Sequence, residues 1–319
     1  MTDKPPILFI NTSYPAALPD LEKEFTVYNY RDAKDKEVLV AEAAKHDVRA
    51  IYTNGSAWIP AMLKDLPKLE VVACTSTGYD EFDIEDVKKH GVRISYSPEL
   101  TAVDVADLAM ALMLGAARRL TWAERYVRSG QWIIDVKAPL TRRVSGKKLG
   151  IVGLGAIGRE FADRAAGFKM DISYNGPRKK NDVSYRYYSD LVEMAGDVDF
   201  LIVACVGGTK TEGVVNADVL KALGPDGIVV NVARGTCING PALLSALRNG
   251  TIGGAGLDCH PMEPVDPKIY EGLENVALTP HFGSGTPDTR IEMSNLAIEN
   301  LRAFFDGKPL LSPIPEIPN

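Results

Sequence analysis

Four side chains with catalytic potential lie at or after the ends of three apolar runs of the sequence. Arg234 comes directly after GIVVNVA, and His281 comes directly after NVALTP. Asp258 ends the run GGAGLD, and Glu263 follows in the loop CHPMEP. Such runs predict buried strands, and ligands bind at the carboxyl ends of strands in open α/β sheets. These groups suit reduction of a 2-keto acid: arginine binds the carboxylate and polarises the ketone, histidine supplies the proton, and a carboxylate orients the histidine.

His260 is the rival to His281 as proton donor. It precedes a proline in its loop and lacks the glycine that follows His281, so His281 is the preferred acid. His46 and His90 fall in charged helical stretches and are expected at the surface. The histidines show no paired ligand spacing, so no metal site is predicted.

A second chemical signal is the glycine pattern in GIVGLGAIGREFA. Gly153, Gly155 and Gly158 form G-x-G-x-x-G between a predicted strand and a predicted helix. The first glycine permits a tight turn, the second admits a pyrophosphate, and the third lets helix and strand pack closely. Amides at the helix N-terminus then face the phosphates. The residues expected to bind the dinucleotide here are Gly153, Leu154, Gly155, Ala156, Ile157 and Gly158.

The stretch ISYNGPRKK, residues 172–180, indicates which dinucleotide binds. An acid that bonds the ribose 2′-hydroxyl is expected about 20 residues beyond the glycine motif. Asn175 stands there instead, followed by a Gly-Pro turn that carries Arg178 and Lys179. Asparagine does not repel a 2′-phosphate, and arginine can bind one with two hydrogen bonds. The stretch favours NADP over NAD, and the alternative is a solvated loop tip.

The elements that must position these residues form two alternating series. Strands are predicted at 7–10, 50–53, 70–74 and 91–97, with helices at 35–46 and 83–91. An apolar helix at 101–120 follows, and then strands at 149–153, 171–175, 199–205, 227–233, 253–258 and 275–280. The last helix, 289–308, is expected to return to the first domain. Alternation of this kind predicts an α/β protein with two Rossmann-like, doubly wound parallel sheets.

The predicted domains are therefore a discontinuous substrate-binding domain, 1–100 with 287–319, and a dinucleotide-binding domain, 101–286. A cleft is expected between them. Trp58, Trp122 and Trp132 are expected to pack in the core.

Composition narrows the class of partner and the compartment. A net charge of −6 and a pI near 5.4 argue against nucleic acid or an anionic membrane as the main partner. The first apolar run is too short for a signal peptide, and no stretch reaches the length of a membrane span. The four cysteines form no C-x-x-C pair. Buried free thiols and a cytoplasmic location are expected.

The motifs LTAVDVADLAMALML, GLGAIG, NVARG, GGAGLD, EP and PHFGSGT occur in one order and spacing along nearly the whole chain. In this the sequence resembles the D-isomer-specific 2-hydroxyacid dehydrogenase family, and most of all its NADPH-dependent glyoxylate, hydroxypyruvate and hydroxyphenylpyruvate reductases. The resemblance implies a catalytic set of Arg234, Glu263 and His281. It also implies that Asp258 holds the nicotinamide carboxamide and that the backbone of Thr77 and Gly78 faces the substrate carboxylate, together with Arg234 and His281.

The same resemblance implies further cofactor contacts and an assembly. The segment ACVGGTKTEG departs from the family's usual proline-containing stretch, and it is expected to line the adenosine pocket. The cofactor contacts implied outside the glycine turn are Asn175, Arg178, Lys179, Cys205, Val206, Thr211, Val232, Ala233 and Asp258. Homodimers are common in the family, and the alternative for Trp132 is an arm between subunits.

The resemblance implies NADPH-dependent reduction of glyoxylate and hydroxypyruvate to the D-2-hydroxy acid. One alternative is the same chemistry on an aromatic pyruvate or a sugar acid, because nothing in the sequence fixes the far wall of the pocket. Another is a dinucleotide sensor that acts through protein partners, like the C-terminal-binding corepressors. An acidic pI and a basic cofactor turn favour the enzyme.

Overall fold

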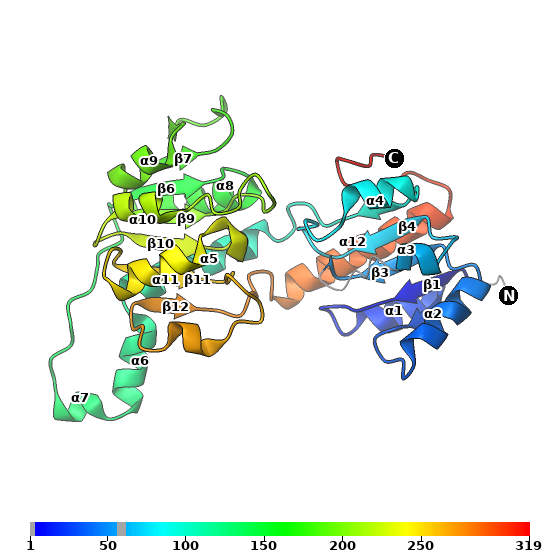
Figure 1. The fold of residues 1–319 in the computed structure, drawn as a ribbon, viewed down its shortest axis with the longest axis horizontal. Helices are drawn as coiled ribbons and strands as arrows, with labels where there is room; N and C mark the ends of the chain where they lie inside the picture. Colours follow the sequence, from blue (N-terminus) through cyan, green and yellow to red (C-terminus); the bar gives the residue numbers. More distant parts are fainter. Residues whose placement is uncertain (1–3, 56–61) are drawn as a thin grey trace. The chain divides into compact units, whose positions relative to one another are not determined.

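The computed structural model describes residues 4–55 and 62–319 (Figure 1). Trp58 lies outside the described residues. The chain divides into two compact units. The smaller unit comprises Met1–Thr101 and Gly285–Asn319, and the larger unit comprises Ala102–Ser284. Each unit is built on one parallel sheet with helices beside it, which confirms the predicted α/β class with two Rossmann-like sheets.

The smaller unit contains a five-stranded parallel sheet in the order β2-β1-β3-β4-β5. Its strands are β1 (Pro6–Phe9), β2 (Thr26–Asn29), β3 (Ala50–Thr53), β4 (Val71–Cys74) and β5 (Arg93–Ser95). Its helices are α1 (Ala17–Glu24), α2 (Lys36–Lys45), α3 (Met62–Asp65), α4 (Ile84–Lys89) and α12 (Pro287–Phe305). The sequence did not predict β2, because this edge strand is only partly buried and therefore lacks an apolar run.

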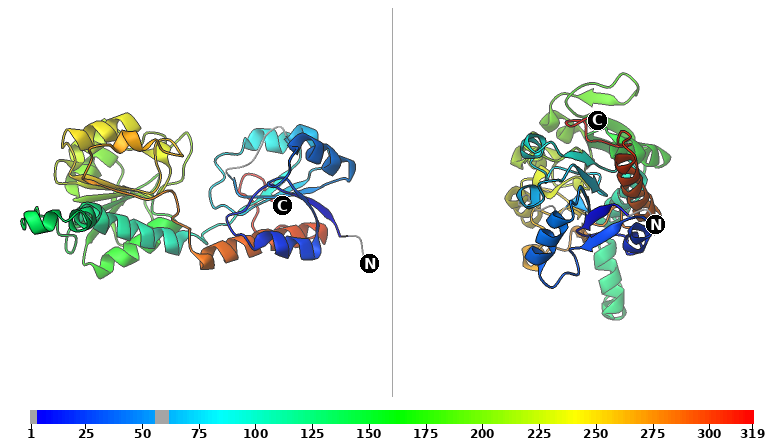
Figure 2. Two further views of the ribbon diagram at one scale, coloured as in Figure 1. Left: turned by 90° about the horizontal axis from the view of Figure 1, so that it is seen from below. Right: turned by 90° about the vertical axis from the view of Figure 1, so that its right-hand side faces the viewer.

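Helix α12 completes the smaller unit from the far end of the chain. The Thr286 side chain caps it by accepting a hydrogen bond from the Thr289 amide, and a proline occupies its first turn. Its buried face packs on β4, and the Tyr52 hydroxyl lies 3.0 Å from the Ser294 hydroxyl. The smaller unit is discontinuous in sequence because this helix belongs to it (Figure 2).

The larger unit contains a seven-stranded parallel sheet in the order β12-β11-β10-β9-β6-β7-β8. Its strands are β6 (Lys148–Val152), β7 (Asp171–Asn175), β8 (Arg186–Tyr188), β9 (Phe200–Val203), β10 (Ile228–Asn231), β11 (Gly254–Leu257) and β12 (Val276–Leu278). Its α-helices are α5 (Ala102–Ala117), α6 (Leu120–Arg128), α7 (Gln131–Ile134), α8 (Ala156–Gly167), α9 (Leu191–Asp197), α10 (Ala217–Leu223) and α11 (Gly240–Arg248), with 3₁₀ turns η2 (Gly235–Cys237) and η3 (Pro267–Tyr270). The edge strand β8 was also not predicted.

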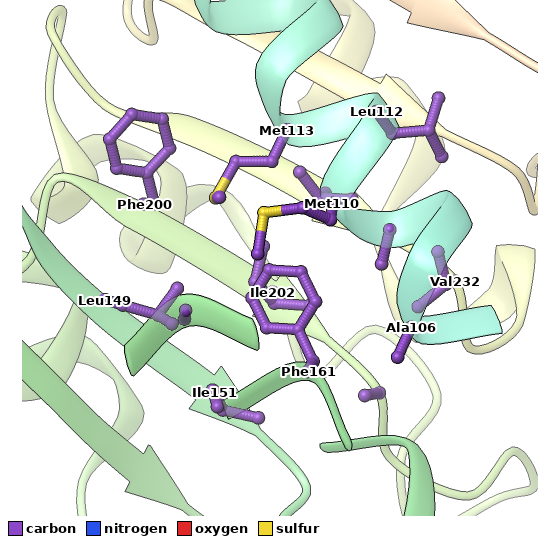
Figure 3. Packing of buried hydrophobic residues seen from close by; sticks show 14 of the residues in the cluster. Ala106, Met110, Leu112, Met113, Leu149, Ile151, Phe161, Phe200, Ile202 and Val232 are labelled. Carbon is purple, nitrogen blue, oxygen red and sulfur yellow. The ribbon is translucent and has the colours of Figure 1, made fainter. Parts of the chain in front are cut away.

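The core of the larger unit lies on both faces of its sheet because strand side chains alternate. Phe200 and Ile202 of β9 point to the face covered by α5 and α8, where Met113 of α5 and Phe161 of α8 are fully buried (Figure 3). The intervening Leu201 belongs to the core on the other face. Helix α5 is therefore apolar on most of its surface, as the sequence predicted.

Helices α6 and α7 form an arm that extends away from the rest of the larger unit (Figure 2). No residue of either helix is buried. Trp132 is 54% exposed, and Ile133 and Ile134 beside it are 89% and 77% exposed. The expectation that Trp132 packs in the core is therefore wrong, because the arm leaves the sheet that would cover it. Trp122 is partly buried and stacks on Tyr126, with ring centroids 4.7 Å apart.

Two further expectations concern the whole chain. Within residues 4–55 and 62–319, every helix is too short or too polar to cross a membrane. The predicted free thiols are confirmed, since Cys74, Cys205, Cys237 and Cys259 are all unpaired. Cys205, in the loop after β9, is only half-buried, whereas the other three cysteines are buried.

Candidate active site

The predicted catalytic side chains follow three strands that are neighbours in the larger sheet. Arg234 follows β10, Glu263 follows β11, and His281 follows β12. These strands are parallel, so their carboxyl ends lie along one edge. The sheet order therefore brings the three loops together, although the chain separates them.

Glu263 and His281 are in direct contact. Glu263 Oε2 lies 2.5 Å from His281 Nδ1, which is a charge-assisted hydrogen bond when the imidazole is protonated. This bond raises the pKa of His281 above its ordinary value, against the lowering effect of burial and of nearby Arg234. Burial acts to raise the pKa of Glu263, but hydrogen bonds from His281 and from the His260 amide outweigh it and lower the pKa. The pair therefore favours a carboxylate beside a protonated imidazole.

The backbone at His281 adopts a conformation that is rare for this residue type. Its φ is +49°, in the left-handed region. The amide of His281 donates to the carbonyl of Asp258 at 3.0 Å, which holds the turn in place. Residues kept in this region by surrounding bonds cluster at functional sites.

Asp258 is buried and ties the β11 loop to the β12 loop. Its Oδ1 accepts hydrogen bonds from the Thr279 hydroxyl at 2.7 Å and the Phe282 amide at 3.0 Å. Its Oδ2 accepts one from the Gly283 amide at 3.0 Å. The carboxylate thereby fixes both sides of His281.

Sequence reasoning did not identify Asn231 as part of the site. The Nδ2 of this buried residue donates to the carbonyls of Arg234 at 2.9 Å and Cys259 at 3.3 Å. Its Oδ1 accepts from the Ala233 amide at 3.1 Å. Asn231 therefore ties the β10 loop to the β11 loop, as Asp258 ties β11 to β12. A polar residue inside the apolar run GIVVNVA was the available signal.

Arg234 is half-buried at the start of its loop. The next residue, Gly235, has no room for a side chain. A Cβ on Gly235 would lie 1.6 Å from the carbonyl oxygen of His260, so the two loops touch through their backbones here. The Arg234 guanidinium also donates to the carbonyl of Ala233 at 3.1 Å. Its positive charge acts to lower the pKa of His281.

The rings of the other three histidines lie in different surroundings from that of His281. His260 is buried, and both of its ring nitrogens are hydrogen-bonded inside the protein, to the Tyr270 hydroxyl and the Thr279 carbonyl. No ring nitrogen of His260 is left to protonate a ligand. His46 and His90 are exposed at the ends of α2 and α4, as predicted.

One group of potential metal ligands occurs among the described residues. The Sγ of Cys259 and ligand atoms of Glu263 and His281 lie within 4.8 Å of one another. The thiol is buried and donates to the carbonyl of Ala233 at 3.2 Å. Burial and nearby carboxylates raise its pKa, so it stays protonated, whereas metal binding requires the thiolate. The group is thus poorly suited to hold a metal.

The glycine turn has the shape that a pyrophosphate needs. Gly153 has a φ of +94°, and a Cβ there would lie 2.5 Å from Cα of Cys205. A Cβ on Gly158 would lie 2.3 Å from the carbonyl oxygen of Gly153. Gly155 is the N-cap of α8 and provides no side-chain cap, which leaves the first amides of the helix for a ligand. Leu154 is buried, whereas Ala156 and Ile157 are half-buried in the first turn of α8.

The turn after β7 presents two cations to solvent. Asn175 ends β7, and its Nδ2 donates to the carbonyl of Tyr188 on β8 at 2.9 Å. The Tyr187 hydroxyl donates to the carbonyl of Gly176 at 3.0 Å and fixes the start of the turn. Arg178 and Lys179 are exposed and form no ion pair with any described residue. They are therefore available to an anionic ligand.

The remaining predicted cofactor contacts lie after β9 and β10. Cys205 is half-buried and Val206 is exposed. The Thr211 hydroxyl donates to the Val206 carbonyl at 2.6 Å, which closes this loop on itself. Val232 and Ala233 are buried directly after β10.

The predicted substrate loop lies in the smaller unit, after β4. The Thr77 hydroxyl donates to the Ser97 carbonyl at 2.7 Å and lies 3.1 Å from the Thr101 hydroxyl. The Gly78 carbonyl accepts a hydrogen bond from the Ser76 hydroxyl at 2.6 Å. The side chain of Thr77 is thus used inside the smaller unit.

Comparisons with known proteins agree on one family. The family model described as "D-isomer specific 2-hydroxyacid dehydrogenase, NAD binding domain" matches residues 110–283. The chain is 43% identical to hydroxyphenylpyruvate reductase of Plectranthus scutellarioides, over 92% of this chain and 94% of that protein. It is 42% identical to a glyoxylate/hydroxypyruvate reductase A of Arabidopsis thaliana, with the same coverage. Among solved structures, the NADPH-dependent glyoxylate/hydroxypyruvate reductase of Sinorhizobium meliloti, in complex with NADP and malonate, is 35% identical with a TM-score of 0.88, over 98% of both chains.

Proposed function

Since the chain belongs to the D-isomer-specific 2-hydroxyacid dehydrogenases, we propose that it reduces small 2-keto acids with NADPH and yields the D-2-hydroxy acid. Glyoxylate and hydroxypyruvate are the proposed substrates, because relatives with these names match most of the chain. The 2.5 Å contact between Glu263 and His281 beside the Arg234 loop carries the proposal. An imidazole kept protonated by a carboxylate is what a ketone needs as it gains negative charge.

Each of the three side chains has a distinct part in this reaction. The Arg234 guanidinium binds the substrate carboxylate and polarises the ketone oxygen. His281 donates a proton to that oxygen from the ring nitrogen opposite Glu263, whose contact with Nδ1 leaves Nε2 for the substrate. Glu263 holds the imidazole in orientation and stabilises its charge. The reduced nicotinamide supplies the hydride to C2 when it is bound.

The two units have separate tasks in this proposal. The larger unit binds the dinucleotide through the glycine turn, with Cys205, Val206, Thr211, Val232 and Ala233 lining the adenosine and nicotinamide sides and Asp258 holding the carboxamide. The smaller unit is the substrate-binding domain, where the backbone amides of Thr77 and Gly78 face the substrate carboxylate.

A panel of 2-keto acids, each assayed with NADPH and with NADH, tests the proposed function. The panel contains glyoxylate, hydroxypyruvate, an aromatic pyruvate and a 2-keto sugar acid. Highest kcat/KM for glyoxylate or hydroxypyruvate with NADPH supports the proposal. Preference for the aromatic or sugar acid would keep the chemistry and change the substrate. NADPH binding without oxidation by any member of the panel would instead indicate a dinucleotide sensor.

The cations after β7 give the basis for choosing NADPH. Arg178 and Lys179 are exposed and free for a 2′-phosphate, while Asn175 stands where an acid would repel it. We expect Arg178→Ala to raise the KM for NADPH about 10- to 100-fold, because the variant loses a hydrogen bond between charged groups. The KM for NADH should stay within about twofold of wild type, since NADH lacks that phosphate.

Steady-state kinetics with both cofactors measure this change in selectivity. Lys221→Ala removes an exposed cation from α10 and serves as the matched control. If Arg178→Ala raised the KM for NADPH and the KM for NADH by the same factor, the turn would be only a charged loop.

We also propose a homodimer in which the arm of α6 and α7 covers a second copy of the chain. Ile133, Ile134 and Trp132 expose apolar surface together at the tip of the arm, a feature that marks interaction sites. The double variant Ile133→Asp with Ile134→Asp should have a mass near 34.6 kDa by light scattering, whereas wild type should have about twice that mass. Val38→Asp, at an exposed apolar residue of α2, is the control. An unchanged mass in the double variant would remove the arm from the interface.

A cytoplasmic location is the remaining proposal. All four cysteines are free thiols, which is typical of a reducing compartment. Cell fractionation with an antibody against the chain tests it.

A further inference from the structure

His260 occupies a buried position at which both ring nitrogens can be assigned. It lies in the loop after β11 and is 5% exposed. Its Nε2 is 2.8 Å from the Thr279 carbonyl oxygen, which can only accept, so Nε2 carries the proton. Its Nδ1 is 2.9 Å from the Tyr270 hydroxyl. Burial raises the pKa of Tyr270 to about 12. This phenol therefore keeps its proton and donates a hydrogen bond to Nδ1 of His260.

These bonds connect His260 to both members of the Glu263–His281 pair. The main-chain N–H of His260 donates to Glu263 Oε1 at 2.8 Å, while the other carboxylate oxygen contacts His281. The ring bonds the carbonyl of Thr279, two residues before His281 in the chain. His260 therefore anchors Glu263 through its backbone and the loop of His281 through its side chain.

The backbone of His260 is itself fixed by neighbouring loops. Its carbonyl lies so close to Gly235 that a Cβ there would be 1.6 Å away. Its ring meets the Tyr270 ring edge to face, with centroids 5.7 Å apart and planes at 62°. The ring is thus held on two sides: its bond to the Tyr270 hydroxyl lies within the β11 loop, and its bond to the Thr279 carbonyl sets the spacing between the β11 and β12 loops.

We propose that His260 is a positioning residue for the proposed reaction: it holds Glu263 and the His281 loop in register, so that carboxylate and imidazole keep their short contact. The inference rests on the proposed function for its meaning in catalysis, but the geometry it predicts can be measured without turnover. Loss of the ring bonds would free the β11 loop from the Thr279 carbonyl and lengthen the contact between Glu263 and His281.

The pKa of His281 is a direct readout of that contact. The charged groups that face His281 are Glu263, Arg234 and Asp258. Glu263 has the largest effect and raises the pKa, whereas Arg234 lowers it and Asp258 raises it. A longer contact with Glu263 must therefore lower the pKa of His281, while a purely structural defect elsewhere would leave it unchanged.

Three variants separate positioning from folding. His260→Phe keeps an aromatic ring and removes both ring hydrogen bonds. His260→Gln retains an amide donor that can reach the Thr279 carbonyl, and it should restore part of any loss. His90→Phe removes an exposed histidine from the end of α4 and is the matched control. The chain has four histidines, so loss of one imidazole signal in each of these variants assigns His260 and His90, and loss of one in His281→Asn assigns His281.

We expect His260→Phe to lower the pKa of His281 in NMR titrations of the cofactor-free protein. In steady-state kinetics, kcat should fall about tenfold, which is less than the roughly 10²–10⁴-fold loss expected when a general acid is removed. The KM should stay within about twofold of wild type. His260→Gln should lie between His260→Phe and wild type, and His90→Phe should match wild type. An unchanged NADPH dissociation constant shows that each variant is folded.

Two outcomes overturn the proposal. One is a His281 pKa in His260→Phe equal to that of wild type, whether or not kcat falls. The other comes from the wild-type protein alone: ¹⁵N chemical shifts that place the proton of His260 on Nδ1 would contradict the bond to Thr279 and would decide the matter even if the variants do not fold. A wild-type protein that reduced no 2-keto acid would remove the proposed function, yet the NMR titration would still test the positioning.

Discussion

Replacing His281 by asparagine is expected to lower kcat/KM for reduction of glyoxylate or hydroxypyruvate about 10²- to 10⁴-fold, the usual worth of a general acid. Asparagine is the better choice than alanine here, because His281 has a φ of +49° and asparagine tolerates that conformation. The loss should therefore reflect chemistry rather than a disturbed turn. NADPH binding, measured by fluorescence, should be unchanged. Activity near that of wild type would remove His281 from the role of proton donor.

The pH dependence provides the second half of this test. Only protonated His281 can donate, so kcat/KM for reduction should be full below its pKa and should fall as pH rises through it. Because Glu263 raises that pKa, the fall should come at a higher pH than an ordinary histidine would give. In His281→Asn the alkaline fall should disappear, since no titrating donor remains. A fall that persists unchanged would place the titrating acid elsewhere.

The parts of the fold that the sequence predicted are those buried in the sheets. Strands such as β9 and β10 are covered on both faces and appear as apolar runs, and the residues after them could be identified at once. The edge strands β2 and β8 are only partly buried, so they carry no such signal. Trp132 was misplaced for a different reason: an aromatic side chain alone does not show whether it lies in the core or on an exposed arm.

The candidate site was predictable in its members but not in its connections. Arg234, Glu263 and His281 stand out because charged residues follow buried strands. The bonds from Asn231, Asp258 and His260 cross between strands, so they depend on the sheet order β12-β11-β10 and on loop geometry. Single-residue chemistry therefore predicted the candidate residues, while the bonds that hold their loops together required the structure.

The cofactor turn shows the same limit. The absence of an acid at Asn175 and the cations behind it were apparent in the sequence. The bond from Asn175 to the Tyr188 carbonyl was not, because it requires β8, a strand that was not predicted. This bond directs the amide nitrogen of Asn175 toward β8. The side-chain oxygen of Asn175 has no hydrogen-bond partner among the described residues.

Replacement of Arg234 by alanine is expected to lower kcat/KM for 2-keto acids about 10²- to 10³-fold, the usual effect of removing one group that stabilises developing negative charge. Arg234→Lys should recover only a small part, because an ammonium cannot bind the carboxylate and the ketone oxygen with a planar fork. NADPH binding should be unaffected. Arg31→Ala, at an exposed arginine paired with Asp32 in the smaller unit, is the matched control.

A second effect of Arg234→Ala distinguishes a role beside His281 from a general loss of charge. Arg234 lowers the pKa of His281, in opposition to Glu263. Its removal should therefore raise that pKa and move the alkaline fall of the residual activity to higher pH, opposite in direction to the shift expected for His260→Phe. A lower kcat/KM with an unmoved alkaline limb would place the Arg234 guanidinium too far from His281 for both groups to act on one ketone oxygen.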